Sequence, residues 1–336
     1  MTTTQTTQTT QTRELTFAEA INDAFDIALG SDPTVLLLGE DIADPPGGVV
    51  RLTHGLSTKY GTQRVRATPI SEQAIVGAAI GAALGGLRPV AEIMLMDFIA
   101  LVMDQLVNHA GKHRYMSGGT SHLPLTVHTR IGHRRGAQHS SSYEAWFMHA
   151  PGIKVCVPAT AADAKGLLLS CIFDDDPCLY LEPTPMVRSR GRTEVPTGDY
   201  RVPIGQAAVP RAGSDVSIIT YGQQTPAALD AAAMLADEGI SAEVVDLRSL
   251  VPLDHQTVLT SVAKTRRAVV THAATRFAGP GAEISAMINE ELFGQLERPV
   301  RRVASASTPV PFASSLAQAY SPDASTIAES VREVVR

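Results

Sequence analysis

A glutamate at the start of an unusual apolar stretch is the first side chain in this sequence with the setting for chemistry. Residues 68–89 read TPISEQAIVGAAIGAALGGLRP. Ser71 is a favourable N-cap, and Glu72 then falls in the first helical turn. A helix N-terminus stabilises negative charge, which gives Glu72 a structural purpose. The alternative is an acid that meets a ligand nitrogen in a dry site, and the stretch alone favours the structural interpretation.

The helix that follows Glu72 predicts a close contact. Residues 74–84 are almost all Ala, Gly, Ile, Val and Leu, and a helix that is apolar all round is a buried helix. Gly77 and Gly81 each lower helix propensity by roughly 1 kcal/mol. The usual reason for such glycines is the close approach of another backbone or a ligand. We therefore expect a buried helix with Glu72 at its mouth.

His139 is the second side chain with the setting for chemistry. It lies in a polar loop, residues 131–142, that reads IGHRRGAQHSSS and follows an expected strand at 123–129. Histidine titrates near neutral pH, and loops at strand ends often carry function. A surface loop histidine is the other interpretation, and the sequence gives the two equal weight.

Other candidate positions have a structural explanation that the sequence favours. Glu40 and Asp41 end a buried strand and are either paired acids or surface carboxylates. Phe98 is either core or a stacking platform for a flat ligand ring. The acids at 174–176 resemble a cation site but are usually a solvated turn before proline. His122, His128, His133 and His149 lack the i, i+4 spacing of a zinc helix, so we set zinc aside.

Composition excludes several classes of protein. The chain has 336 residues, 44% hydrophobic and 18% charged, with a net charge of −6. This length suits two domains, and the charge argues against nucleic-acid binding. No apolar run reaches the ~18 residues of a membrane span, and the N-terminus does not resemble a secretory signal. Three scattered cysteines, without metal spacing, are typical of the reducing cytoplasm.

Strands and helices are expected to alternate. Expected strands are 34–38, 88–94, 123–129, 153–157, 178–181, 216–220, 242–246, 267–272 and 300–303. Expected helices are 17–29, 54–60, 97–114, 144–149, 159–172, 224–238, 254–263, 278–293 and 325–335. The alternation predicts an α/β protein with two doubly wound domains, each with a parallel sheet covered on both faces. We expect a disordered Thr/Gln-rich tail at 1–13, domains at 14–185 and 206–336, and a linker at 186–205.

Several long motifs occur in a characteristic order. They are GED at 39–41, TPISEQAIVGAAIGAAL, AEIMLMDFIALVMDQLVNHAGKHRYMSGG, GAQHSSSYEAWFMHAPGIKV and ADAKGLLLSCIFDDDP. With them the chain resembles, over residues 14–336, the β subunit of the E1 component of 2-oxoacid dehydrogenase complexes, which include pyruvate, branched-chain and acetoin types. The resemblance implies a pyrimidine-binding domain, then a transketolase C-terminal-like domain, in a thiamine diphosphate enzyme of α2β2 form.

The resemblance also implies roles for residues at matching positions. Glu72 would hydrogen-bond the aminopyrimidine ring of thiamine diphosphate, and Phe98 would lie against that ring. Ile70 and Met94 would line the same pocket. His139 would take part in proton transfer and in handing the acyl group to a lipoyl group. The cofactor would act as the electron sink when CO₂ leaves.

Two metal ions belong to this implied picture. Near a structural potassium site that some members have lie Leu125, Thr126, Cys171, Asp174 and Asp176. Carbonyl oxygens supply much of such a site, so side chains test it poorly. The GDG…Asn motif that binds Mg²⁺ and diphosphate is absent from this sequence. In this family the α subunit carries it, so we expect the chain to be inactive alone, with the active site between α and β.

The implied activity is oxidative decarboxylation of a small 2-oxo acid, with acyl transfer to the lipoyl group of an E2 partner. Alternatives are acyl transfer to another acceptor such as a carrier protein, acetoin cleavage, or a non-catalytic structural subunit. Ala273 and residues 305–308 depart from the family pattern, because each lacks an expected acid. Both departures lie in the domain that contacts partners, so they bear on E2 binding more than on cofactor chemistry.

Overall fold

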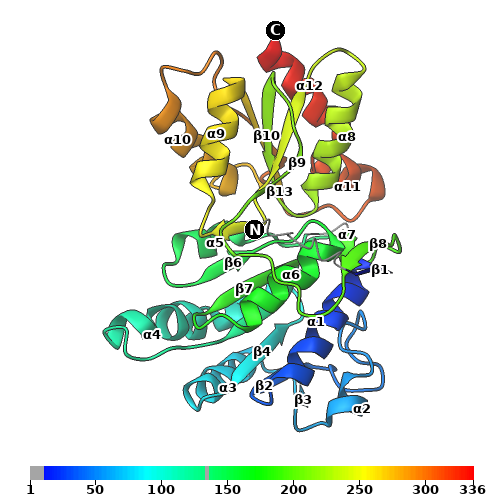
Figure 1. Ribbon diagram of the computed structural model, residues 1–336, viewed down its shortest axis with the longest axis vertical. Helices are drawn as coiled ribbons and strands as arrows, with labels where there is room; N and C mark the ends of the chain where they lie inside the picture. The colour runs from blue at the N-terminus through cyan, green and yellow to red at the C-terminus, as the bar shows by residue number, and fades with distance from the viewer. Residues whose placement is uncertain (1–10, 133–135) are drawn as a thin grey trace, which may run out of the picture.

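Two α/β units make up the chain, and each is built around a mostly parallel sheet (Figure 1). The structure is a computed structural model that describes residues 11–132 and 136–336. In Figure 1 the first unit, blue to green, lies below the second unit, which runs to red at the C-terminus. Most of the tail predicted at residues 1–13 falls outside the described residues.

The first sheet has the strand order β12-β6-β7-β5-β4-β2-β3. All neighbouring pairs are parallel except β12–β6. Its strands are β2 (Val35–Glu40), β3 (Val65–Thr68), β4 (Arg88–Ile93), β5 (Thr126–Ile131), β6 (Lys154–Cys156), β7 (Cys178–Pro183) and β12 (Ser249–Val251). The antiparallel strand β12 comes from the second half of the chain, so the two units share this sheet edge.

Helices cover both faces of this sheet. They are α1 (Phe17–Ser31), α2 (Leu56–Tyr60), α3 (Glu72–Leu84), the 3₁₀-helix η1 (Met96–Val102), the π-helix η2 (Asp104–Ala110), α4 (Gly111–Met116), α5 (Glu144–His149), α6 (Ala161–Ile172) and α7 (Thr184–Val187). Alternate residues of a strand face opposite sides. In β2, Leu36 and Leu38 therefore share a core with α3, and Val35 and Leu37 share another with α1 and α6.

The second sheet has the order β14-β13-β10-β11-β9, with only β9 antiparallel to its neighbour. Its strands are β9 (Ala208–Arg211), β10 (Val216–Thr220), β11 (Ala242–Asp246), β13 (Ala268–Thr275) and β14 (Arg301–Ser305). Its helices are α8 (Gln224–Ala236), α9 (His255–Thr265), α10 (Pro280–Leu292), α11 (Ser314–Tyr320) and α12 (Ala324–Val335). Helices α8 and α12 pack on one face, and α9 and α10 on the other. The predicted α/β fold with doubly covered sheets is confirmed.

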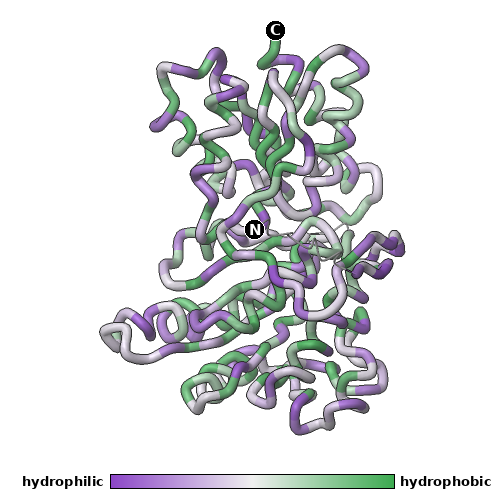
Figure 2. Tube along the Cα trace, viewed as in Figure 1, coloured by the Kyte–Doolittle hydropathy of each residue, from purple (hydrophilic) through white to green (hydrophobic). Residues whose placement is uncertain are grey.

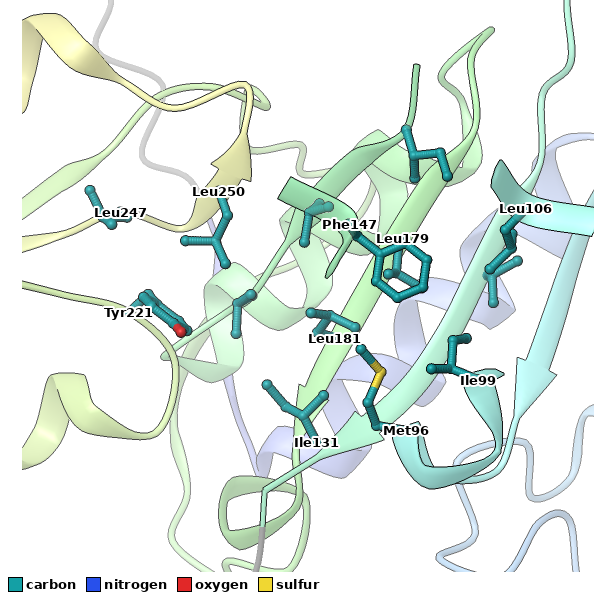
Figure 3. Packing of buried hydrophobic residues seen from close by; sticks show 14 of the residues in the cluster. Met96, Ile99, Leu106, Ile131, Phe147, Leu179, Leu181, Tyr221, Leu247 and Leu250 are labelled. Atoms are coloured by element: carbon teal, nitrogen blue, oxygen red, sulfur yellow. The ribbon is translucent and has the colours of Figure 1, made fainter. Parts of the chain in front are cut away.

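One apolar core runs from the first unit into the second. Tyr221, Leu247 and Leu250 of the second unit belong to the same buried cluster as Phe147 and Leu181 of the first (Figure 3). Figure 2 shows the hydrophobic segments concentrated along the strands of both units. In the described part of the chain, no helix has the length and apolar character needed to cross a bilayer.

The long helix predicted at residues 97–114 is present, but it is not a single α-helix. The segment is instead a 3₁₀-helix, a π-helix and a short α-helix in succession. At its end, Gly111 and Gly152 press their backbones together: a Cβ on Gly152 would lie 1.8 Å from the Gly111 carbonyl oxygen. Helical periodicity in the sequence cannot report such a contact between distant segments, nor the wider π turn that precedes it.

Short edge elements were missed in the sequence. Strand β1 (Thr12–Leu15) pairs antiparallel with β8 (Thr193–Pro196), and these strands fall in segments predicted to be tail and linker. Strands β3, β9 and β12 and helices α7 and α11 were also not predicted. All are short, and they lack the long apolar runs or repeated spacing from which the sheet strands and longer helices were predicted.

The composition of helix α3 predicted that the helix is buried on all sides, but only one side is buried. Ile75, Val76, Ala79 and Ala83 face the core, while the opposite side of the helix is exposed. Ser71 stands at the N-cap position, but its side chain makes no capping hydrogen bond. The composition of α3 correctly predicted an apolar helix. It does not indicate whether the exposed side of the helix packs against this chain or against another one.

The three cysteines, scattered in sequence, meet in the core of the first unit. Cys156, Cys171 and Cys178 are free thiols and are buried. Hydrogen bonds to Cys156 and then Cys178, together with burial, raise the pKa of the Cys171 thiol well above its usual value. Cys171 is therefore a protonated, unreactive thiol.

Candidate active site

The carboxyl ends of four adjacent parallel strands meet at one edge of the first sheet. Glu40 ends β2 and lies opposite Thr68, which ends β3. Met94 directly follows β4, and Gly132 follows β5. In open α/β sheets this edge is where ligands bind. Both sequence candidates lie here, because Glu72 begins α3 just after β3 and His139 lies in the loop after β5.

Glu72 is a nearly buried acid in an acidic setting. As the first residue of α3 it is only 8% exposed. Burial, and next the charge of Glu72, raises the pKa of Glu40. Glu40 is half-buried rather than a simple surface carboxylate, which corrects the interpretation favoured by its sequence. Glu40 therefore retains its proton more readily than an isolated glutamate does.

Phe98 and His139 are brought together from segments 41 positions apart. Their ring centroids lie 6.1 Å apart, with the planes at 77°, so the rings meet edge to face. Phe98 is half-buried and packs partly on the apolar core, while His139 is exposed. Phe98 is thus only partly a core residue, because part of its ring remains accessible to a ligand.

Ile70 and Met94 flank Glu72 at the same edge. Ile70 is 82% exposed, which is unusual for a large aliphatic side chain beside a nearly buried acid. Met94 is half-buried, and its carbonyl accepts a hydrogen bond of 2.9 Å from Arg130 Nε. These candidate residues therefore lie along an open edge of this chain.

A buried polar network behind the site was not foreseen. His128 on β5 contacts Glu182 on β7, with Nδ1 2.6 Å from Oε1, and Glu92 on β4, with Nε2 3.8 Å from Oε2. Burial opposes the charge on His128, but the Glu182 carboxylate prevails and raises the pKa of His128. The available signal was three polar residues inside otherwise apolar strand sequences, because buried charges need partners.

The residues expected near a potassium ion lie together at the start of β5 and the end of α6. The carboxylates of this segment already have cationic partners in the chain. Asp174 is 2.6 Å from Lys154 Nζ, and Asp176 is 2.7 Å from Arg114. Leu125 and Cys171 offer carbonyl oxygens, each with one backbone N–H already bound. A monovalent cation fits here only through the remaining carbonyl lone pairs, with Thr126 buried beside them.

Comparison with known proteins accounts for both units. The pyrimidine binding domain of transketolase matches residues 13–189, and the transketolase C-terminal domain matches residues 205–327. The acetoin:2,6-dichlorophenolindophenol oxidoreductase subunit beta of Cupriavidus necator is 44% identical over 335 residues, covering 96% of this chain and 98% of that protein. The chain belongs to the E1 β subunit family. The resemblance found in the sequence is thereby confirmed.

Other relatives of this E1 β chain are named for different donors. The pyruvate dehydrogenase E1 component subunit beta of Bacillus subtilis is 42% identical over 96% of the chain and 99% of that protein. The mitochondrial 2-oxoisovalerate dehydrogenase subunit beta of Chaetomium thermophilum is 47% identical over 89% of the chain and 65% of that protein. Among solved structures, an inactive split-gene transketolase β4 tetramer matches with a TM-score of 0.77 and 25% identity, over 96% of this chain and 99% of that one.

A cavity of about 1160 Å³ lies where the second unit of this E1 β chain meets the His139 loop. Gln224, which follows β10, and Thr275, which ends β13, line it opposite Ser140. Ala273 and Thr308 also line it, so positions in both departures from the family pattern meet at this cavity. Ala273 and Thr275 therefore face this cavity, whereas His272, between β13 residues of the core, is buried.

His272 is a neutral structural histidine. Its Nδ1–H donates to the carbonyl of Ala274 at 3.1 Å, and its Nε2 accepts from the backbone N–H of Gly281 at 3.0 Å. Burial lowers the pKa of His272 to about 4. A Cβ on Gly281 would lie 2.7 Å from that Nε2, so the glycine is needed for the contact.

Glu144 is a second acid with an altered pKa, at the junction of the two units. It is fully buried at the start of α5, and Tyr221 Oη donates to its Oε1 at a long 3.5 Å. Burial raises the pKa of Glu144 to about 7. Because a buried carboxylate is poorly solvated, the acid stays protonated over a range in which an exposed glutamate has already ionised.

Glu144→Gln should change how stability depends on pH. The folded-state pKa of about 7 lies above the ordinary 4.5. The stability that this group contributes is therefore fully present below pH 4.5 and lost as pH rises through 7. Relative to wild type, the variant should gain on the order of 3 kcal/mol between pH 4.5 and pH 8. Urea unfolding of both proteins at the two pH values measures the difference between their free energies of unfolding. The contributions of the other titrating groups cancel in this difference. An equal difference at both pH values would contradict the raised pKa.

Proposed function

We propose that this chain is the β subunit of a thiamine diphosphate-dependent E1 enzyme. The reaction is oxidative decarboxylation of a small 2-oxo acid, followed by acyl transfer to the lipoyl group of an E2 partner. The observation that carries the proposal is the nearly buried Glu72 at the edge of the first sheet where the Phe98–His139 ring pair also lies. The helix N-terminus alone could explain the acid, but it does not explain an aromatic ring and a histidine brought to the same edge.

The residues at this edge fit the aminopyrimidine end of the cofactor. Thiamine diphosphate, when bound, supplies the electron sink that decarboxylation needs. Glu72 holds and returns a proton at the ring nitrogen. Phe98 offers a ring face, and Ile70 and Met94 supply apolar walls. His139, exposed on its loop, moves a proton during acyl handover.

The α subunit completes this site in our proposal. Ile70 is exposed beside Glu72, and the outer face of α3 is apolar but open. A Cβ on Gly77 or Gly81 would meet no atom within 4 Å. Small residues on an exposed helix face allow a second backbone to approach closely. We assign this face to α in an α2β2 heterotetramer.

Magnesium belongs to the α side of the same proposal. Within residues 11–132 and 136–336, no group of three or more His, Cys, Asp or Glu side chains is arranged to hold a metal ion. The sequence also lacks the GDG motif. We therefore expect the Mg²⁺ and diphosphate ligands to come from α. The free thiols of this chain are consistent with a cytoplasmic location, which is part of the proposal.

Potassium is the finer part of the cofactor proposal. If K⁺ binds the carbonyl oxygens near Leu125 and Cys171, a K⁺ concentration of ten times the Kd should raise the free energy of unfolding by about 1.4 kcal/mol. The melting temperature should then rise by about 2–3 °C in KCl relative to NaCl at equal ionic strength. Differential scanning calorimetry in the two salts measures this. Identical melting in both salts would remove potassium from the proposal.

Acetoin cleavage is the second candidate reaction. The relatives in Cupriavidus necator and Bacillus subtilis, 44% and 41% identical, are both named acetoin:2,6-dichlorophenolindophenol oxidoreductase subunit beta. Co-expression with the α chain, followed by dye reduction with pyruvate, branched 2-oxo acids or acetoin, separates the donors. Turnover of acetoin alone would replace the 2-oxo acid. No turnover of any donor by a well-folded, cofactor-loaded heterotetramer would contradict both candidates.

The acyl acceptor requires a separate assay. Ala273 and residues 305–308 differ from the family pattern in the unit expected to contact E2, which keeps a carrier protein as an alternative acceptor. The loaded heterotetramer is incubated with either a lipoyl domain or an acyl carrier protein. Mass spectrometry then shows which of the two acceptors gains the mass of an acyl group. Acylation of the lipoyl domain supports the E2 assignment.

A further inference from the structure

Asp97 connects the two elements that carry Phe98 and His139. It is the second residue of η1 and immediately precedes Phe98. Its Oδ1 accepts a hydrogen bond of 2.7 Å from Ser141 Oγ, and its Oδ2 accepts one of 3.3 Å from the Ser141 backbone N–H. Ser141 is two residues after His139. One carboxylate therefore holds the end of the His139 loop against the turn that bears Phe98.

Ser141 is also where the loop returns to the sheet. Its carbonyl accepts a hydrogen bond of 3.2 Å from the backbone N–H of Gly132, the first residue after β5. The Ser141 N–H, hydroxyl and carbonyl are thus all engaged, two of them by Asp97. A hydrogen bond to an ionised acceptor is about twice as strong as a neutral one. The Asp97 contacts are therefore the stronger part of this attachment.

Within residues 11–132 and 136–336, few contacts hold the side chain of His139 in place. The side chain is exposed, and its ring contact is the edge-to-face approach to Phe98 at 6.1 Å. Proton transfer requires heavy atoms within about 2.6–3.2 Å, and misplacement by about 1 Å can lower a rate 10²-fold. The position of this histidine must come from its backbone, which Asp97 fixes through Ser141.

We propose that Asp97 is a positioning residue that sets His139 relative to Phe98 for acyl transfer. The inference rests on the proposed function, because it takes His139 as the group that acts in that step. Asp97 does not touch the reacting atoms and acts only through Ser141. Its loss should therefore affect acyl transfer more than the earlier steps, in which Glu72 acts.

Asp104 provides a matched control in the next helical segment. Its carboxylate accepts from Asn108 at 2.9 Å and lies 3.4 Å from His109, so both partners are within its own turn. Removing that acid changes charge and local helix contacts but leaves the His139 loop untouched. Asp104→Ala thus measures how far the loss of a carboxylate from this helical segment, without any change at the His139 loop, affects acyl transfer.

The test uses the cofactor-loaded heterotetramer with Asp97→Ala, Ser141→Ala, the double variant and Asp104→Ala. Acyl transfer to a lipoyl domain is compared with dye reduction, using whichever of pyruvate or 2-oxoisovalerate turns over. We expect Asp97→Ala to lower kcat for lipoyl acylation about 10- to 100-fold, with dye reduction and KM within about threefold. The double variant should be no slower than Asp97→Ala, and Asp97→Asn, which keeps one acceptor oxygen, should be intermediate.

Two outcomes would overturn the proposal. One is unchanged acylation in Asp97→Ala, and the other is an equal fall in acylation and dye reduction. Hydrogen exchange of residues 136–147 gives a readout that needs no activity, and we expect at least tenfold faster exchange at Ser141 in Asp97→Ala but not in Asp104→Ala. If His139→Ala leaves acylation intact while this exchange result holds, the assigned role of His139 fails and the structural attachment stands. Unchanged exchange would refute the attachment itself.

Discussion

Glu72→Gln is expected to lower turnover of the loaded heterotetramer by about 10²- to 10⁴-fold, the range that a positioned acid–base group contributes. The amide has the same shape and burial, so α3 should keep its first turn and the sheet edge its packing. What it loses is the capacity to take up and return a proton at the ring nitrogen. The measurement is kcat for dye reduction at saturating thiamine diphosphate and Mg²⁺.

Two controls separate this chemistry from a folding defect. Calorimetric titration should show that the variant still binds thiamine diphosphate, since Phe98 and the apolar walls are unchanged. Glu40→Gln should reduce turnover far less, because Glu40 is not proposed to exchange a proton with the ring. A Glu72→Gln heterotetramer that turns over at the wild-type rate would remove Glu72 from the mechanism.

The parts of the site that the sequence predicted are those that depend on residues close together in the chain. Strand β2 was evident as an apolar run, and the sequence from Ser71 onward predicted the start of α3. Glu72 was singled out as an acid before an apolar helix, and His139 as a titratable side chain in a polar loop after a strand. Their order along the chain also matched a family, and that resemblance implied a role for both in cofactor chemistry and acyl transfer.

The parts that the sequence could not predict depend on residues far apart in the chain. Asp97 and Ser141 are 44 positions apart, and each looks like an ordinary polar residue in a loop or turn. His128 and Glu182 are 54 positions apart and meet only because β5 and β7 are neighbours. Neither periodicity nor local propensity contains this information, because strand order is a property of the whole sheet.

Helix α3 illustrates a different limit. An apolar helix must bury its surface, but composition does not say against which chain. Here one face packs on the first sheet, and the face with Gly77 and Gly81 remains open. The glycines thus lower helix stability in this chain without a contact to compensate for it. Such a cost is consistent with an assembly in which a second subunit supplies the contact.

Gly81→Leu should therefore have opposite effects on the chain and on the assembly. In the isolated chain a Cβ at this position meets nothing within 4 Å, and leucine favours a helix over glycine by roughly 1 kcal/mol. The free energy of unfolding should rise. Against a closely packed α subunit the same side chain would overpack the contact by about 1–3 kcal/mol, so Kd for α should increase about 5- to 150-fold.

Sedimentation velocity of mixed α and β chains measures the assembly, and urea unfolding of β alone measures the fold. Gly294→Leu is the matched control, because this exposed glycine also has open space around it but lies far from α3, in the second unit. It should leave Kd unchanged. If Gly81→Leu also leaves the heterotetramer intact, α3 does not face the α subunit. Destabilisation of the isolated chain would instead mean that the open face is already covered by β itself, for example in a β dimer.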